Sequence, residues 1–186
     1  KEDGTGVWIE LSMSNAAIAT FATYTFADQA DIFVNARLAA DAVGATKMDR
    51  PEWGGVNPIT GEIYQTLTNN SNRRVAPAAG GSQLMPDGAN PRAYTDIKGT
   101  SEQKGNPNGH ILRMKDVGGS ATTSFMWDIY LFGAEAGADT TKINMSKLSA
   151  DQDFSSPDGL AFSQNTGLCW IQTDDGAYTD VTNCMM

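Results

Sequence analysis

The sequence has only one histidine, His110, among its 186 residues. A zinc hydrolase site with two or three histidine ligands is therefore excluded, as is the HExxH motif of metalloproteases. The sequence also lacks GxSxG, a P-loop and GxGxxG, which removes the α/β-hydrolase elbow and the common nucleotide-binding loops. A serine hydrolase triad would need His110. Because this histidine stands between a turn and a predicted strand, we interpret it as a surface or hydrogen-bonded structural residue.

Cysteine, long apolar runs and positive charge are scarce as well. Cys169 and Cys184 form neither a CxxC motif nor a disulfide framework, and Cys169 is predicted to be a small core residue. No apolar run is long enough to span a bilayer. The 22 acidic and 13 basic residues give a net charge of −9. This balance argues against nucleic-acid binding, which needs a positive surface, and is compatible with hard cations held by carboxylates.

One template occurs twice in the chain, as PEWGGVNPITGEIYQT at residues 51–66 and as PDGLAFSQNTGLCWIQ at residues 157–172. Each copy opens with proline and a carboxylate. Each also has a Thr-Gly pair that fits a hairpin turn, because glycine adopts positive φ without a steric penalty. The alternating or β-branched flanks predict two β-hairpins. Repetition at this spacing favours about two or three blades of a β-propeller, and two unrelated hairpins in a β-sandwich are the alternative.

The remaining segments predict an all-β chain with one short helix and long loops. Residues 6–13 alternate as a strand does, and residues 28–43 have the helical spacing of apolar side chains. Asp28 is the predicted N-cap of that helix and Gly44 its stop. Two further strands are predicted at residues 110–117 and 121–133. Residues 71–109 are rich in Gly, Pro, Asn and Ser and are predicted to be one long loop.

We predict that residues 1–186 form a single domain that is part of a larger β-propeller. About seven or eight strands fill roughly two four-stranded blades, whereas a closed propeller needs about four or more. Further residues, or other copies of the chain, would complete it. The sequence starts with Lys1 rather than Met, so we do not expect it to start where the native protein does, and the lack of a signal-peptide pattern carries no information.

The chemistry that the sequence permits is concentrated where loops lead into the two hairpins. In a propeller, Glu52 and Asp158 would lie near the central channel, and converging carboxylates repel each other unless a cation neutralises them. Such oxygen ligands favour calcium, magnesium, manganese or ferric iron. Asn69 and Asn70 could add carbonyl oxygens, and Arg50 could bind an oxyanion such as phosphate. The alternative is that each acid only caps a turn.

Several segments, in the same order over most of the chain, resemble the PhoX-type alkaline phosphatases. They include MDRPEW, LTNNS, GHILR, FMWDIYLFG and SPDGLAF. The resemblance implies a six-bladed β-propeller that is secreted to the periplasm or the cell exterior. It also implies hydrolysis of phosphomonoesters by Fe³⁺ and Ca²⁺ ions bound in the propeller channel.

Carried over by motif, the resemblance implies that Glu52 is a metal ligand and Asp158 an iron ligand. Arg50 would contact the substrate phosphate, with Asn69 and Asn70 as neighbouring substrate-binding residues. Arg50, Glu52 and Asp158 are therefore the predicted catalytic residues. The predicted partners are a phosphomonoester substrate and the rest of the propeller or other copies of the chain, with no nucleic acid and no membrane span.

The sequence departs from the family pattern in ways that keep two other functions open. It corresponds to the middle portion of such an enzyme, and neither cysteine occupies the place of the iron-ligating cysteine. A calcium-binding propeller module without catalysis is one alternative. A calcium-dependent lactonase-like hydrolase is the other, because PDGLAFSQNTGLCW also resembles those propellers.

Overall fold

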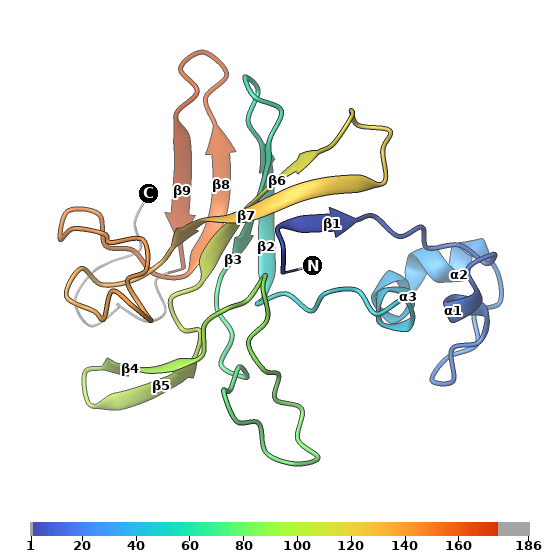
Figure 1. Cartoon of the computed structure of the whole chain (residues 1–186), viewed down its shortest axis with the longest axis horizontal. Helices are drawn as coiled ribbons and strands as arrows, with labels where there is room; N and C mark the ends of the chain where they lie inside the picture. Colours follow the sequence, from blue (N-terminus) through green and yellow to red (C-terminus); the bar gives the residue numbers. More distant parts are fainter. Residues whose placement is uncertain (1, 175–186) are drawn as a thin grey trace. The chain divides into compact units, whose positions relative to one another are not determined.

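The computed structural model describes residues 2–174 and divides the chain into two compact units. One unit comprises the residues up to Gly6 and those from Met48 onward, and the other is Val7–Lys47. The described residues form nine strands and three helices (Figure 1). None of these helices has the length and apolar character needed to cross a membrane. The fold is mostly β, and the single-domain organisation stays a prediction.

A five-stranded sheet in the order β1-β7-β6-β3-β2 forms the centre of the larger unit. From β2 to β7 this sheet is an antiparallel meander, since β2 pairs with β3, β3 with β6, and β6 with β7. The strands predicted at residues 110–117 and 121–133 are confirmed as β6 and β7. The strand bounds are Thr5–Val7 for β1, Pro51–Val56 for β2, Ile63–Leu67 for β3, His110–Asp116 for β6 and Ser124–Phe132 for β7.

The second predicted hairpin is confirmed as β8 (Pro157–Phe162) and β9 (Cys169–Thr173), which form a separate two-stranded sheet beside the first (Figure 1). Leu160 of β8 is buried in a core cluster with Tyr64 of β3. A Cβ atom added to Gly55 of β2 would lie 2.5 Å from Leu160 Cδ2. The two hairpins therefore pack closely through β2, β3 and β8.

Of the two cysteines, only Cys169 lies among the described residues. Cys169 is half-buried and packs against the core cluster around Leu160, as predicted, and burial raises the pKa of its thiol. Cys184 lies outside the described residues, as do residues 175–178, the last four of the sequence DDGAY that follows the second predicted hairpin.

The prediction of one uninterrupted loop over residues 71–109 is wrong. Strands β4 (Tyr94–Lys98) and β5 (Ser101–Gly105) form an antiparallel hairpin within it. This hairpin is a two-stranded sheet of its own. Its sequences, YTDIK and SEQKG, contain few apolar residues. A strand without an apolar face has no period-2 pattern, so the sequence gives no signal for it.

The prediction of a single helix over residues 28–43 is also wrong, although both of its ends are confirmed. Asp28 caps the start by accepting a hydrogen bond from the Asp31 N–H, and Gly44 follows the end with φ of 66°. The helix is interrupted at Asn35, whose side-chain amide donates to Asp31 Oδ1 at 2.7 Å. Such local side-chain bonds compete with the helical pattern. The three helices are α1 (Ala16–Ala19), α2 (Gln29–Val34) and α3 (Ala36–Ala42), and they enclose a core of Ile18, Phe26, Ile32 and Ala39.

The first predicted strand, over residues 6–13, is much shorter than expected, because β1 ends at Val7. Val7, Trp8 and Ile9 are each about half exposed, so their alternation does not mark a face that packs on a core. The apolar pattern continues where the strand has ended.

Candidate active site

Both hairpins begin with the same unusual backbone. Arg50 and Ser156, the residues directly before Pro51 and Pro157, have φ angles of 54° and 57°. Residues other than glycine rarely adopt this left-handed conformation. Among the described residues only Lys147 shares it. The repeat seen in the sequence therefore extends to the backbone on the N-terminal side of each proline.

The two candidate acids lie where the strand pairing is irregular. The β2–β3 register shifts between residues 51 and 54, and the β8–β9 register shifts between residues 157 and 160. Glu52 and Asp158 lie within these shifts. A bulge of this kind frees main-chain groups from the ladder and changes the direction of a side chain.

Two fully buried threonines connect the two hairpin starts. The Thr66 hydroxyl accepts from Trp53 N–H at 2.9 Å and donates to the Asp158 carbonyl at 2.7 Å. The Thr68 hydroxyl donates to the Pro157 carbonyl at 2.9 Å. The main chain next to Glu52 and the main chain of Asp158 are thus joined through β3 and the residue that follows it.

Arg50 is exposed and lies between two carboxylates. Its Nε donates to Glu52 Oε1 at 2.7 Å, and its Nη2 lies 3.8 Å from Asp174 Oδ2. The Asp174 N–H donates to the Ser156 carbonyl, so Asp174 is held at the end of the second hairpin, opposite its start. Asp174 is not among the site residues predicted from the sequence. The signal that could have found it is its place directly after the predicted hairpin.

The two candidate asparagines occupy different surroundings. Asn70 is half-buried; its amide donates to Asp49 Oδ1 at 2.8 Å, and its side-chain oxygen accepts from Asn72 N–H at 2.8 Å. Asn70 thus faces a buried network that begins one residue before Arg50. Asn69 is half-buried too, and its side chain makes no hydrogen bond with the residues that the structure describes.

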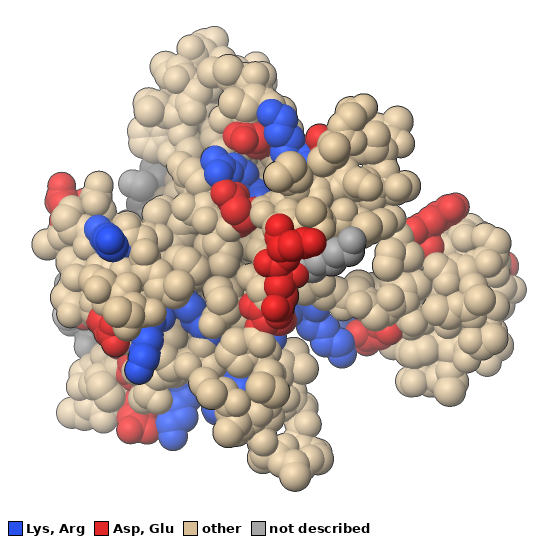
Figure 2. Space-filling view, in the orientation of Figure 1, with Lys and Arg blue, Asp and Glu red and all other residues tan. Residues whose placement is uncertain are grey.

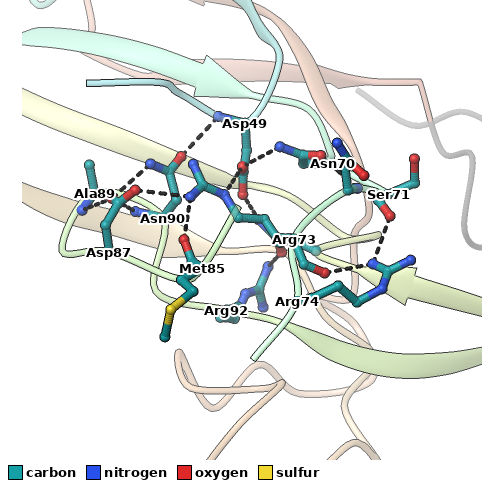
Figure 3. A network of polar contacts seen from close by, with 12 residues as sticks. Asp49, Asn70, Ser71, Arg73, Arg74, Met85, Asp87, Ala89, Asn90 and Arg92 are labelled. Carbon is teal, nitrogen blue, oxygen red and sulfur yellow. Dashed lines mark hydrogen bonds and ion pairs between the residues drawn. The ribbon is translucent and has the colours of Figure 1, made fainter. Parts of the chain in front are cut away.

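The buried network is built around Asp49 and Arg73, both almost completely inaccessible to solvent (Figure 3). Arg73 Nε donates to Asp49 Oδ1 at 2.7 Å, and Arg73 Nη1 lies 3.0 Å from Asp87 Oδ2. Asn106 donates to the second oxygen of Asp49 at 3.1 Å, and the Asp49 N–H donates to Asn90 Oδ1 at 2.9 Å. A buried charge needs this full set of partners. The network therefore fixes the main chain immediately before Arg50.

His110 belongs to the same network and is completely buried. Its Nε2 lies 2.7 Å from the Ala89 carbonyl, which can only accept, so Nε2 bears the proton. Nδ1 then accepts from the Asn106 amide at 3.0 Å, and the Asn106 oxygen is held by Arg92. Burial lowers the pKa of His110 to about 4, with the Arg92 and Arg73 charges acting in the same direction. The interpretation as a hydrogen-bonded structural residue is confirmed, and a surface position is excluded.

The donor set at the hairpin starts suits a hard cation. Glu52 and Asp158 offer carboxylate oxygens, which Ca²⁺ and Fe³⁺ prefer to nitrogen or sulfur. Among residues 2–174 there is no group of three or more His, Cys, Asp or Glu side chains that could hold a metal ion. The donor atoms of the two acids therefore suit such an ion in their chemistry.

These features define a mostly β protein in which two adjacent hairpins each present an acid from an irregular strand start, with an arginine between carboxylates. The family model described as "Alkaline phosphatase PhoX" matches residues 1–185. The chain belongs to this family, and the resemblance seen in the sequence is confirmed.

A solved structure supports the same assignment. Pseudomonas fluorescens PhoX in complex with vanadate, described as a transition state analogue, is 36% identical in sequence, with a TM-score of 0.73. The match covers 98% of this chain and 29% of that one, so the chain spans less than a third of the length of its neighbour. No curated protein matches the chain.

Proposed function

We propose that this chain forms part of a metal-dependent phosphomonoester hydrolase, an alkaline phosphatase. The observation that supports this most is the family match over nearly the whole chain, together with a neighbour solved with vanadate. Vanadate is an oxyanion like phosphate, and in that neighbour it serves as a transition state analogue. The exposed Arg50 beside two acids is the kind of group that can bind such an oxyanion.

We propose that the chain forms part of a six-bladed β-propeller. The meander β2-β3-β6-β7 has the four antiparallel strands of one blade, and β8-β9 would begin the next. The close approach of Gly55 to Leu160 supports this arrangement, because the first strands of successive blades lie side by side around the axis. Remaining blades would come from further residues or from other copies.

In this proposal Glu52 and Asp158 are ligands of Fe³⁺ and Ca²⁺ at the channel. Bound there, the ions would polarise the phosphate and lower the pKa of a water nucleophile. Arg50 would orient the phosphate and stabilise the charge that develops on its oxygens. Asn69 could reach the substrate directly, whereas Asn70 would act through Asp49, to which its amide is bonded.

The cellular location of the protein is part of the proposal. We place it in the periplasm or outside the cell. This location rests on the resemblance alone and is testable by cell fractionation.

On the face drawn in Figure 2, Lys and Arg side chains are dispersed, several of them close to Asp or Glu. With the net charge of −9, this distribution supports a small phosphoester rather than a nucleic acid as the partner.

Replacement of the two acids in the native, metal-loaded protein tests the site. We expect Glu52→Gln and Asp158→Asn each to abolish hydrolysis of p-nitrophenyl phosphate and to lower the bound iron and calcium measured by elemental analysis. Glu62→Gln is the matched control, because Glu62 lies at the turn end of the first hairpin, away from Pro51. Full activity of both site variants would contradict the assignment. Calcium binding without phosphatase activity in the parent would favour the non-catalytic module, and activity on a lactone would favour the lactonase-like hydrolase.

A further inference from the structure

The main chain at the two hairpin starts has hydrogen-bonding groups that the strand ladders do not satisfy. The register shifts remove regular pairing around Glu52 and around Asp158. Buried main-chain groups without a partner are costly, so they are normally satisfied from elsewhere. Here the partners are the hydroxyls of Thr66 and Thr68, which are both fully buried.

Each threonine joins one hairpin to the other. Thr66 accepts from Trp53 N–H, beside Glu52, and donates to the carbonyl of Asp158 itself. Thr68 donates its hydroxyl to the Pro157 carbonyl, and its N–H donates to the Arg50 carbonyl at 3.1 Å. The segments that contain the two acids are therefore linked twice, through the hydroxyls of two fully buried threonines.

These links differ from ordinary sheet packing in their chemistry. Apolar contacts such as Leu160 against Tyr64 are not directional. A hydrogen bond from a buried hydroxyl fixes distance and direction together. Carboxylates that share one metal centre need this precision, because coordination distances vary little.

We propose that Thr66 and Thr68 are positioning residues that set the spacing between Glu52 and Asp158 for a shared metal centre. The inference rests on the proposed function. The threonines do not touch the metal or the substrate. They hold the main chain from which the two candidate ligands project, and the hydroxyl, rather than the shape of the side chain, is the part that matters.

Substitution by valine tests this directly, because valine keeps the shape of threonine and replaces the hydroxyl with a methyl group. In the native protein we expect Thr66→Val and Thr68→Val each to weaken metal affinity about 10–100-fold, the range typical of groups that orient metal ligands. Metal affinity is measured by titrating the chelator-treated protein with Ca²⁺ and with Fe³⁺. The value of kcat should fall together with the metal affinity. Thr66→Ser and Thr68→Ser keep a hydroxyl at these positions and should retain both the metal affinity and kcat of the parent. Thr60→Val is the matched control, because its hydroxyl bonds only within the turn of the first hairpin.

Urea unfolding of the metal-free variants separates positioning from simple structural support. A lower unfolding midpoint with unchanged metal affinity in the folded protein would overturn the proposal, and so would serine variants as impaired as the valine variants. Should Thr66→Val fail to fold, Thr68→Val is subject to the same criteria. Valine variants with unchanged metal affinity and kcat, found together with inactive Glu52→Gln and Asp158→Asn variants, would refute the inference and leave the proposed function standing. Full activity and full metal content in the Glu52→Gln and Asp158→Asn variants would refute both the inference and the proposed site.

Discussion

Replacing His110 with glutamine should remove a large part of the pH dependence of stability in weak acid. In the folded protein the pKa of His110 is lowered to about 4, below the ordinary value of 6.5, first because it is buried. Protonation would also require Nδ1 to carry a hydrogen that points at the Asn106 amide, which is already a donor. Folding therefore keeps the imidazole neutral. The stabilisation is complete above pH 6.5 and is lost as the pH falls towards 4, because the unfolded chain binds the proton first.

The difference between the two pKa values corresponds to about 3 kcal/mol, at about 1.4 kcal/mol for each tenfold change in proton affinity. Glutamine offers a neutral donor and acceptor and does not titrate. We expect the parent to lose roughly 3 kcal/mol of unfolding free energy between pH 7.5 and pH 4 from this residue, and His110→Gln to lose that much less. Urea unfolding at a series of pH values, followed by tryptophan fluorescence, measures both slopes.

The carboxylates with perturbed pKa values do not obscure this window. Hydrogen bonds lower the pKa of Asp31, Asp139 and Asp151 below the ordinary value of 3.8, so their contributions are lost in stronger acid. If the stability of His110→Gln fell between pH 7.5 and pH 4 as steeply as that of the parent, burial of a neutral histidine would not be the source of the slope.

Two further predictions concern glycines at close contacts. Gly55→Ala would place a Cβ 2.5 Å from Leu160 Cδ2 and should cost about 1–3 kcal/mol of unfolding free energy. Leu160→Val in the same protein should recover part of that loss, and strictly additive losses in a urea double-mutant cycle would contradict the contact. Gly109→Ala combines φ of 64° with a Cβ only 2.1 Å from a main-chain oxygen, so it should cost more than about 2 kcal/mol. Gly61→Ala, with φ of 70° and open space, should cost about 1–2 kcal/mol, and an equal loss in both variants would refute the steric argument.

The two hairpins could be predicted from the sequence because their signals are local. The Thr-Gly pairs mark turns, and Gly61 and Gly167 both have φ of 70° there. The flanking residues alternate or are β-branched, as half-buried strands require. The irregular starts could not be predicted, because they depend on partners such as Thr66 that bond across to the other hairpin, 92 positions away.

The buried network was beyond sequence reasoning for a related reason. Polar residues such as Arg73 and Asn106 belong to the segment predicted to be a loop, and composition assigns such residues to the surface. Both are buried because Asp49, 24 and 57 positions away, supplies a matching charge or acceptor. Pairing over such distances leaves no periodic pattern. Arg50 and the two acids stay predicted site residues, and the sequence contains no signal for the buried groups that hold the main chain beside them.

The two hairpin starts share a backbone conformation, and this similarity is more informative than the similarity of their residue types. Arg50 and Ser156 both adopt a left-handed conformation, which costs about 1–3 kcal/mol when the residue is not glycine. Such a cost persists only where the surroundings determine the conformation. Before Arg50 the Asp49 network does so, and at Ser156 the N–H donates to the Asn108 carbonyl at 2.9 Å while the hydroxyl donates to the Pro107 carbonyl.

Different buried polar groups thus hold the same strained turn at two places 106 positions apart in the chain, at Pro51 and at Pro157. A turn required only to reverse the chain direction could use glycine, as the two hairpin turns do at Gly61 and Gly167. Retaining strain in a non-glycine residue at both starts instead directs the following proline and acid along one fixed path. In the site that we propose, the strain would direct Glu52 and Asp158, and the threonine links would set the distance between them.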